Sequence, residues 1–250
     1  MVTGNRSSTA ARAPISRSST GSTERHAKRV ERPLEGRTIL TGTTLAIECA
    51  TPACSVALFD NGAMVAGVHE VLGRGHAERL VPMIAGLPDK GRADRIVVSR
   101  GPGSFTGVRI GIAVARALGF AWGAQVEGYP TLALVAAMAR AEAGAAKPVT
   151  VCMNGGHGEW FVQDFDETGA AAGDALSLAP EAAAQRTVHR TIAGERAGEL
   201  AALLPEGAHR AIDLLPDARH TQLLAEGTFA ADTSPIYGRG PDAQPMSTSR

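Results

Sequence analysis

Residues 101–123 read GPGSFTGVRIGIAVARALGFAWG, and the fold of the surrounding chain is interpreted from this stretch. A glycine–proline–glycine turn comes first, two hydroxyl side chains follow it, and the remainder is a helical segment that is apolar on nearly every side. Small residues recur at every fourth position: Gly107, Gly111, Ala115, Gly119 and Gly123. Residues four apart share one face of a helix, so the pattern predicts a smooth groove that admits another backbone at close range.

The sequence before this stretch predicts an α/β arrangement. Residues 43–71 read as three sequential antiparallel strands, because Asn61-Gly62 lies between apolar runs and is a strong hairpin signal. Residues 76–87 read as an amphipathic helix whose polar side carries His76. A short buried strand within 94–100 then leads into the glycine turn, and this strand–turn–helix order is typical of α/β folds.

The second half of the chain repeats this order. After the long helix, an apolar segment reads as a helix that Thr131 caps, and Lys147-Pro148 marks a boundary. Residues 148–166 then read as strand, glycine-rich turn and strand. We expect the remainder to be mostly helical, with short strands near 191–193 and 211–212. Two halves that each open with strands and close with helices suggest two related lobes.

This organisation divides the 250 residues into a disordered tail or misplaced start over 1–42, a first lobe over 43–147 and a second lobe over 148–250. The tail is rich in Ser, Thr, Arg and Gly and has few aliphatic residues. A targeting peptide is the competing interpretation, although the tail has no apolar core of a secretory signal.

Charge is distributed unevenly along the chain. Residues 1–37 carry eight basic and three acidic residues, which leaves 17 basic and 22 acidic residues for the rest. A protein that grips nucleic acid by itself usually shows a basic patch, so we expect contact with tRNA or DNA to be indirect.

Cysteine usage and hydropathy favour a cytoplasmic location. The three cysteines, Cys49, Cys54 and Cys152, form no C-x-x-C pair, so neither a disulfide framework nor a zinc site is expected, and the first two read as small core residues. The longest weakly polar run, 110–122, is interrupted by Arg116 and is shorter than the roughly 20 apolar residues of a membrane span. No membrane segment is therefore expected.

Familiar catalytic motifs fail around the glycine turn. No lysine follows it as a Walker A loop requires, and a third glycine at Gly107 comes one residue late for the dinucleotide fingerprint. A nucleophile elbow around Ser104 would need glycine where Pro102 stands, so Ser104 reads as a helix cap. The histidines lack metal-ligand spacing, and His76 and His157 read as surface residues.

Two interpretations of the turn remain open on the residues alone. Free N–H groups and the helix dipole make it a plausible phosphate cradle, and Arg109 and Arg116 share a stripe that could reach an anion or an acidic partner. Alternatively, the glycines only allow tight packing of strand and helix. Glu48 lies within the first strand, and we favour a solvent-facing acid there over a buried one that needs a partner.

Four segments together resemble the TsaB (YeaZ) family. They are GPGSFTGVRIG at 101–111, HAERLVPMI at 76–84, TLAIECATPACSVALFD at 44–60 and SPIYGRGPDAQP at 234–245. The resemblance covers roughly residues 44–245. It implies an α/β, two-lobed actin/hexokinase/Hsp70-like (ASKHA) fold with mixed sheets flanked by helices.

The resemblance also implies a function. The family supplies a non-catalytic subunit of the bacterial complex that makes N6-threonylcarbamoyladenosine (t6A) next to the tRNA anticodon, beside a TsaD-like catalytic subunit and a TsaE-like ATPase. ATP and metal are then expected on the partner, with none bound by this chain. The paired histidines of TsaD-like relatives fall near Thr131 and Val135 here, and neither residue can hold a metal as histidine does.

The resemblance predicts a helical docking platform for the TsaD-like subunit or for a second copy of this chain. The predicted interface residues are His76, Leu80, Ile84, Gly107, Arg109, Gly111, Ala115, Arg116 and Gly119. The predicted nucleotide-proximal loop is Gly101, Pro102, Gly103, Ser104, Phe105 and Thr106. An ATP-dependent or metallopeptidase-like enzyme of the same fold is the alternative.

Two segments depart from the family pattern. The family usually has an Asp-Thr-Ser-like run where this chain has Glu48-Cys49-Ala50, and commonly has Asp-Ala-Arg-Arg where this chain reads Asn154-Gly155-Gly156-His157. The first replacement argues against a phosphate-binding role of the first hairpin, and Gly155 and Gly156 cannot do what the arginine pair does in relatives. The C-terminal pattern is kept, in Pro235, Tyr237, Arg239, Pro241, Asp242 and Ala243.

Overall fold

The structure is a computed structural model that describes residues 42–144, 147–186, 188–225 and 227–238. The predicted N-terminal tail, apart from Gly42, lies outside the described residues. The last four residues of the C-terminal family pattern, Arg239, Pro241, Asp242 and Ala243, lie outside them as well.

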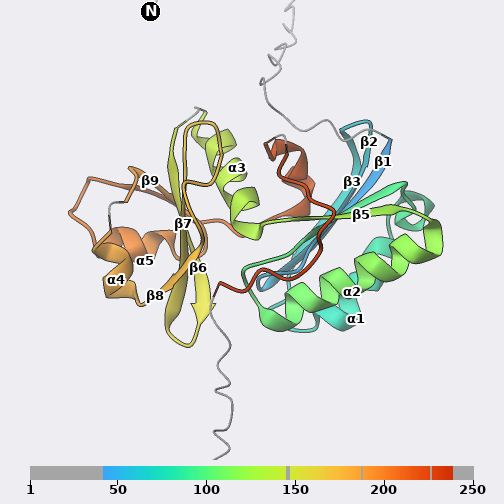
Figure 1. Ribbon diagram of the computed structural model, residues 1–250, viewed down its shortest axis with the longest axis horizontal. Coiled ribbons are helices and arrows are strands. Elements are labelled where there is room, and N and C mark those ends of the chain that lie inside the picture. The colour runs from blue at the N-terminus through green and yellow to red at the C-terminus, as the bar shows by residue number, and fades with distance from the viewer. Residues whose placement is uncertain (1–41, 145–146, 187, 226, 239–250) are drawn as a thin grey trace, which may run out of the picture. The chain divides into compact units, whose positions relative to one another are not determined.

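The first sheet has five strands in the order β3-β2-β1-β4-β5 (Figure 1). The first three strands form the predicted antiparallel meander, and β4 and β5 add in parallel. The hairpin signal is confirmed, because Asn61 and Gly62 take positive φ between two strands. The strands are β1 (Thr43–Glu48), β2 (Ala53–Asp60), β3 (Ala63–Val71), β4 (Arg95–Ser99) and β5 (Gln125–Tyr129).

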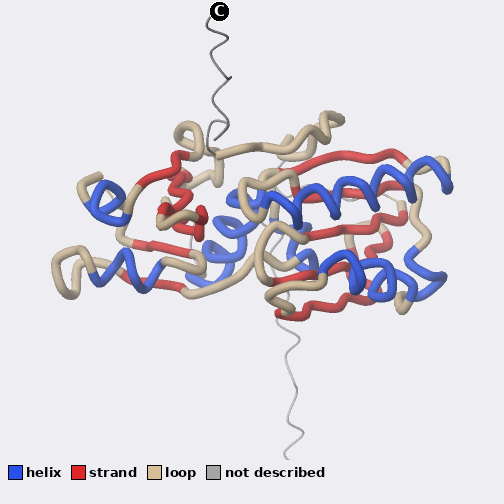
Figure 2. The backbone as a smooth tube through the Cα atoms, turned by 90° about the horizontal axis from the view of Figure 1, so that it is seen from below, coloured by secondary structure: helices blue, strands red, loops and turns tan. Residues whose placement is uncertain are grey.

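Helices cover both faces of this sheet. The two helices α1 (His76–Ala85) and α2 (Phe105–Trp122) lie side by side on one face (Figures 1 and 2), where Leu45 and Ile47 of β1 meet them. The other face, which carries Ala46, packs against α3 (Thr131–Ala143) and a 3-10 helix over Ala218–Leu223. Successive side chains of β1 point to opposite faces of the sheet, with the period of two of a strand. Because helices cover both faces, β1 is buried on both.

The second sheet also has five strands, in the order β10-β9-β6-β7-β8. Helix α3 packs on one of its faces, and the short helices α4 (Pro180–Ala184) and α5 (Ala197–Ala202) pack on the other. The strands are β6 (Val149–Gly156), β7 (Glu159–Phe165), β8 (Leu176–Leu178), β9 (Thr191–Ala193) and β10 (Arg210–Ile212). Because α3 contributes to the cores of both sheets, it joins the two halves that the sequence suggested.

The C-terminal segment returns to the first sheet. Residues 228–238, named the C-terminal strap, pair with β5 through an antiparallel bridge between Gly128 and Ala230. Further along, Ile236 N donates to the Arg100 carbonyl at 2.7 Å. The predicted division at residues 147 and 148 separates the two sheets, but the strap crosses back over it.

Several local predictions were wrong. Strand β5 was missed, and Thr131 is not a cap: Pro130 occupies the N-cap position, and within the described residues no side chain caps α3. The region after residue 166 is less helical than expected.

The described helices include one that meets the length and composition of a membrane span, α2, with a mean hydropathy of 1.2 over 18 residues. A run of small residues on α2 packs against the first sheet, as expected of the core helix of a folded domain.

Candidate functional site

The glycine turn connects β4 to the N-terminus of α2. Gly101 has a φ of 87°, and the Gly101–Pro102 peptide bond is cis. Ser104 is the N-cap, as predicted, because its hydroxyl oxygen accepts from Gly107 N at 3.2 Å. Ser104 N donates to the Ala50 carbonyl at 2.7 Å, so the turn is anchored to the loop between β1 and β2.

The groove of small residues faces this chain's own core, and its prediction as a docking surface is wrong. Gly107, Gly111, Ala115 and Gly119 are all buried. A Cβ at Gly107 would overlap the Cys49 carbonyl oxygen, and one at Gly119 would overlap the Val126 side chain. A Cβ at Gly111 would make ordinary contacts with side chains of the first sheet. The close backbone approach that the pattern predicted therefore exists, but the approaching backbone is that of the β1–β2 loop.

The three interface residues predicted on α1 are also buried. Leu80 and Ile84 belong to the core between α1 and the first sheet. His76 was expected on the polar side, yet it is 8% exposed and its Nε2 donates to the carbonyls of Thr51 at 2.9 Å and Ala53 at 3.3 Å. A ring N–H that satisfies two loop carbonyls explains why a polar residue faces inward.

Arg109 and Arg116 hold the C-terminal strap. Arg109 donates to the Tyr237 hydroxyl at 2.8 Å, and its guanidinium lies 3.6 Å from the centroid of the Phe105 ring. Arg116 Nε donates to Thr233 Oγ1 at 2.9 Å. The predicted stripe is real, and both arginines form hydrogen bonds within this chain.

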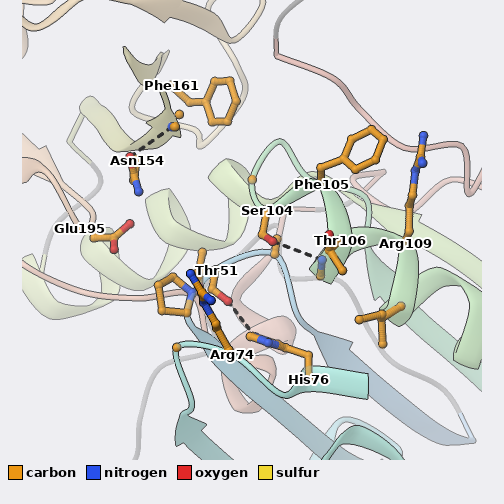
Figure 3. A pocket seen from close by; sticks show the side chains of 18 of the residues that line it. Thr51, Arg74, His76, Ser104, Phe105, Thr106, Arg109, Asn154, Phe161 and Glu195 are labelled. Carbon is orange, nitrogen blue, oxygen red and sulfur yellow. Dashed lines mark hydrogen bonds between the residues drawn. The ribbon is translucent and has the colours of Figure 1, made fainter. Parts of the chain in front are cut away.

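A cavity of about 1350 Å³ opens beside the N-terminus of α2. Gly103, Ser104, Phe105 and Thr106 of the predicted loop line it, whereas Gly101 and Pro102 are buried behind them. Figure 3 shows Ser104 and Thr106 facing the cavity.

The opposite wall of the cavity comes from the second sheet. Asn154, Phe161 and Glu195 lie there, across from α2 (Figure 3). The segment that differs from the family pattern and ends at His157 lines the same wall. Arg74, just before α1, is another lining residue that the sequence analysis did not single out. No spacing in the sequence could have joined these residues, because they come from separate elements that only the fold brings together.

The charges around the cavity balance. Two arginines, Arg74 and Arg109, and two glutamates, Glu78 and Glu195, are among the lining residues. Because these formal charges sum to zero, the cavity lining has no large excess of positive charge.

Glu48 is buried at the end of β1, and the expectation that it faces solvent was wrong. Its carboxylate accepts from Ala50 N at 2.7 Å and from Ser99 Oγ at 2.8 Å, and the Tyr129 hydroxyl lies 3.4 Å away. Burial raises the pKa of Glu48 to about 7, although these hydrogen bonds oppose the shift. The partner that a buried carboxylate needs is therefore a set of hydroxyl and amide groups.

The described residues contain no cluster of three or more His, Cys, Asp or Glu side chains arranged for a metal ion. Thr131 and Val135, which fall near the expected histidine positions, are buried in α3.

Comparisons with known proteins agree with the resemblance. A family model of tRNA N6-adenosine threonylcarbamoyltransferase, TsaD, matches residues 66–185. The tRNA threonylcarbamoyladenosine biosynthesis protein TsaB of Escherichia coli is 34% identical over 230 residues, which cover 78% of this chain and 94% of that protein. TsaB of Haemophilus influenzae is 42% identical over 83 residues, 31% of this chain and 35% of that protein. The solved structure of YeaZ from Pseudomonas aeruginosa is 32% identical with a TM-score of 0.66 and covers 79% of this chain and all of that chain.

The two mixed sheets with helices on both faces define an α/β protein of the actin/hexokinase/Hsp70-like class, as expected. The chain belongs to the TsaB (YeaZ) family, whose members take part in the biosynthesis of threonylcarbamoyladenosine in tRNA.

Proposed function

We propose that this chain is a non-catalytic scaffold subunit of the t6A machinery that binds a TsaD-type catalytic subunit through the outer faces of α1 and α2. The observation that carries the proposal is apolar exposure on these helices: Phe120 is 94% exposed and Val81 is 51% exposed. Apolar groups gathered on one helical surface are typical of a protein interface.

The outward surface of α2 has its own run of small residues. Ala113, Ala117 and Ala121 are exposed and recur at every fourth position, beside Phe120. We name these four residues the outer stripe of α2. On α1, Ala77, Val81 and Ala85 are exposed with the same spacing. Small side chains let a partner helix approach closely, and Phe120 supplies an anchor that is worth about 1.5–3 kcal/mol when fully buried.

The TsaD-type partner is favoured by the family's role in t6A biosynthesis and by the match of residues 66–185 to the TsaD family model. Related folds can present matching helices to each other, so the same surface could pair two copies of this chain. Thr131 and Val135 support a non-catalytic role, because a hydroxyl and an isopropyl group do not replace metal-binding imidazoles. In this proposal ATP and metal are bound by the partner, a TsaE-like ATPase completes the machinery, tRNA contact is indirect, and the assembly is cytoplasmic.

The test is co-purification of this chain with the TsaD-type subunit of the same organism, followed by light scattering on a size-exclusion column. We expect the wild-type chain to form a complex and Phe120→Asp to weaken it at least tenfold. Leu203→Asp is the matched control, since Leu203 is 49% exposed but lies beyond α5 at the second sheet. The control should bind normally.

A homodimer that forms alone and excludes the TsaD-type subunit would contradict the choice of partner. Normal t6A levels after deletion of the gene would contradict the function itself. Equal loss of binding in both variants would show that the effect of Phe120→Asp is unrelated to the outer stripe.

The cavity favours a second candidate, an ATP-binding enzyme of the same fold. Its volume of about 1350 Å³ admits a nucleotide, and the N-terminus of α2 borders it. Calorimetry with ATP and magnesium on the isolated chain separates the candidates. Tight binding and turnover would favour the enzyme, and no binding at millimolar ATP would remove it.

A further inference from the structure

Cys49 and Cys54 face each other at the open end of the β1–β2 pair. The register ends with Glu48 opposite Ser55, so Cys49 and Cys54 continue it as the next facing pair. Their Sγ atoms are 3.6 Å apart, and both thiols are free and buried. Facing Cα atoms in antiparallel strands lie about 4.5–5.5 Å apart, within the roughly 4.4–6.8 Å that a disulfide spans.

We propose that Cys49 and Cys54 are an oxidative modification site, a dithiol that a hydroperoxide converts reversibly into an intramolecular disulfide. The Cys54 thiolate attacks the peroxide, so that an S–O bond forms and the O–O bond breaks; the departing hydroxide takes up the proton that Cys54 released and leaves as water. Cys49 then attacks the Cys54 sulfur, an S–S bond forms, the S–O bond breaks, and the departing hydroxide leaves as the second water with the proton of Cys49. Two thiols and one hydrogen peroxide give one disulfide and two waters.

The order of attack follows from the hydrogen bond between the two sulfurs. Either sulfur can be the donor in the hydrogen bond between them; with Cys49 as the donor, the bond lowers the pKa of Cys54 and raises the pKa of Cys49. The thiolate is the reactive form of cysteine, so Cys54 reacts first and Cys49 resolves the intermediate.

A small oxidant has a route towards the pair. The loop between the two cysteines forms part of the cavity wall, through Ala50, Thr51 and Pro52. The cavity therefore brings solvent to the backbone that joins the two cysteines. Hydrogen peroxide is only slightly larger than water and needs a smaller opening than any alkylating reagent.

The loop that oxidation would tighten supports both helices of the first sheet. His76 at the start of α1 donates to Thr51 and Ala53, and Ser104 before α2 donates to Ala50. A disulfide draws the sulfurs from 3.6 Å to about 2 Å, and we expect the loop to shift beneath these contacts as it forms. We expect the N-terminal turns of α1 and α2 to respond to the redox state of the pair.

The test uses the full wild-type chain, fully reduced and then treated with hydrogen peroxide. Remaining thiols are alkylated with a maleimide in denaturant and mapped by proteolysis and mass spectrometry. We expect Cys49 and Cys54 to lose alkylation together, the peptide that joins them to lose two hydrogens, and dithiothreitol to restore both. Cys152 is the internal control, since it lies in the core of the second sheet, and it should stay alkylated.

Hydrogen exchange on the same samples reports the structural consequence, as faster or slower exchange in residues 50–54 and in the first turns of α1 and α2. In Cys49→Ala the remaining Cys54 should form no intramolecular disulfide. The proposal is overturned if both cysteines stay alkylatable after Cys152 has begun to oxidise, or if the disulfides formed join separate chains. Unchanged exchange in the oxidised protein would overturn the link to the helices.

Discussion

Replacing Glu48 with glutamine should change how the stability of this protein depends on pH. Glu48 is fully buried, and its carboxyl contacts Ala50 N, Ser99 Oγ and the Tyr129 hydroxyl. Glutamine has the same shape, can accept from Ala50 and Ser99 through its oxygen, and can donate from its amide to Tyr129. The substitution therefore removes the charge and keeps the packing.

The magnitude follows from the pKa of Glu48, which rises from 4.5 to about 7 on folding because burial disfavours the carboxylate. The folded state binds the proton more tightly than the unfolded state, so the contribution is fully present below pH 4.5 and is lost as pH rises through about 7. The shift is worth about 3 kcal/mol in total, most of which falls between roughly pH 5 and pH 8.

The measurement is urea unfolding of the wild type, Glu48→Gln and a control, Glu78→Gln, at roughly pH 5 and pH 8. Glu78 is exposed at the start of α1, so its variant should follow the wild type at both pH values. From roughly pH 5 to pH 8, we expect the free energy of unfolding of Glu48→Gln to rise relative to that of the wild type by about 2–3 kcal/mol. A difference between them that is independent of pH would refute the reasoning, because it would mean that Glu48 is ionised in the folded protein throughout.

Three further predictions concern the stability of the first sheet and its helices. Gly119→Leu should lower the free energy of unfolding by about 1–3 kcal/mol, because a Cβ at position 119 would overlap Val126. Ala117→Leu, on the outer stripe, should change the free energy of unfolding by no more than about 0.5 kcal/mol. Comparable losses in the two variants would contradict the inward orientation of the glycines. Ser104→Ala should cost about 1 kcal/mol through loss of the cap to Gly107 N, and an unchanged urea midpoint would show that the cap is dispensable. Thr131→Val should leave stability unchanged or raise it by up to about 1 kcal/mol. The reason is that Thr131 Oγ1 is buried and has no hydrogen-bond partner within the described part of the chain. A loss of stability above about 1 kcal/mol would reveal a hydrogen bond to that hydroxyl.

Much of the fold could be predicted from local signals. Asn61-Gly62 marked the first hairpin, and the apolar run that follows the glycine turn marked α2, with Ser104 as its cap. These features are decided within a few residues of the chain, by allowed φ values and by the unsatisfied N–H groups of a helix N-terminus. Strand β5 was missed because its five residues, with Glu127 and Gly128 among them, show little apolar alternation.

The candidate site was predicted only in part. The loop 103–106 lies at the cavity, but the wall formed by Asn154, Phe161 and Glu195 had no signal in the sequence. The inward orientation of the Glu48 side chain was also not predicted, because its hydrogen-bond partners Ser99 and Tyr129 belong to β4 and β5. Whether a carboxylate is buried depends on what the neighbouring strands place beside it, and a single strand does not contain that information.

By itself the sequence determined that a helix with a small-residue face would be approached closely by another backbone, since a spacing of four fixes which residues share a face. It did not determine whose backbone that is. Only the tertiary structure decided that Gly107 and Gly111 lie on the β1–β2 loop and the first sheet, and that Ala113, Ala117 and Phe120 are left outside. The physical reason is that helical periodicity defines a face, whereas the direction of that face depends on the apolar surface that the rest of the fold buries against it.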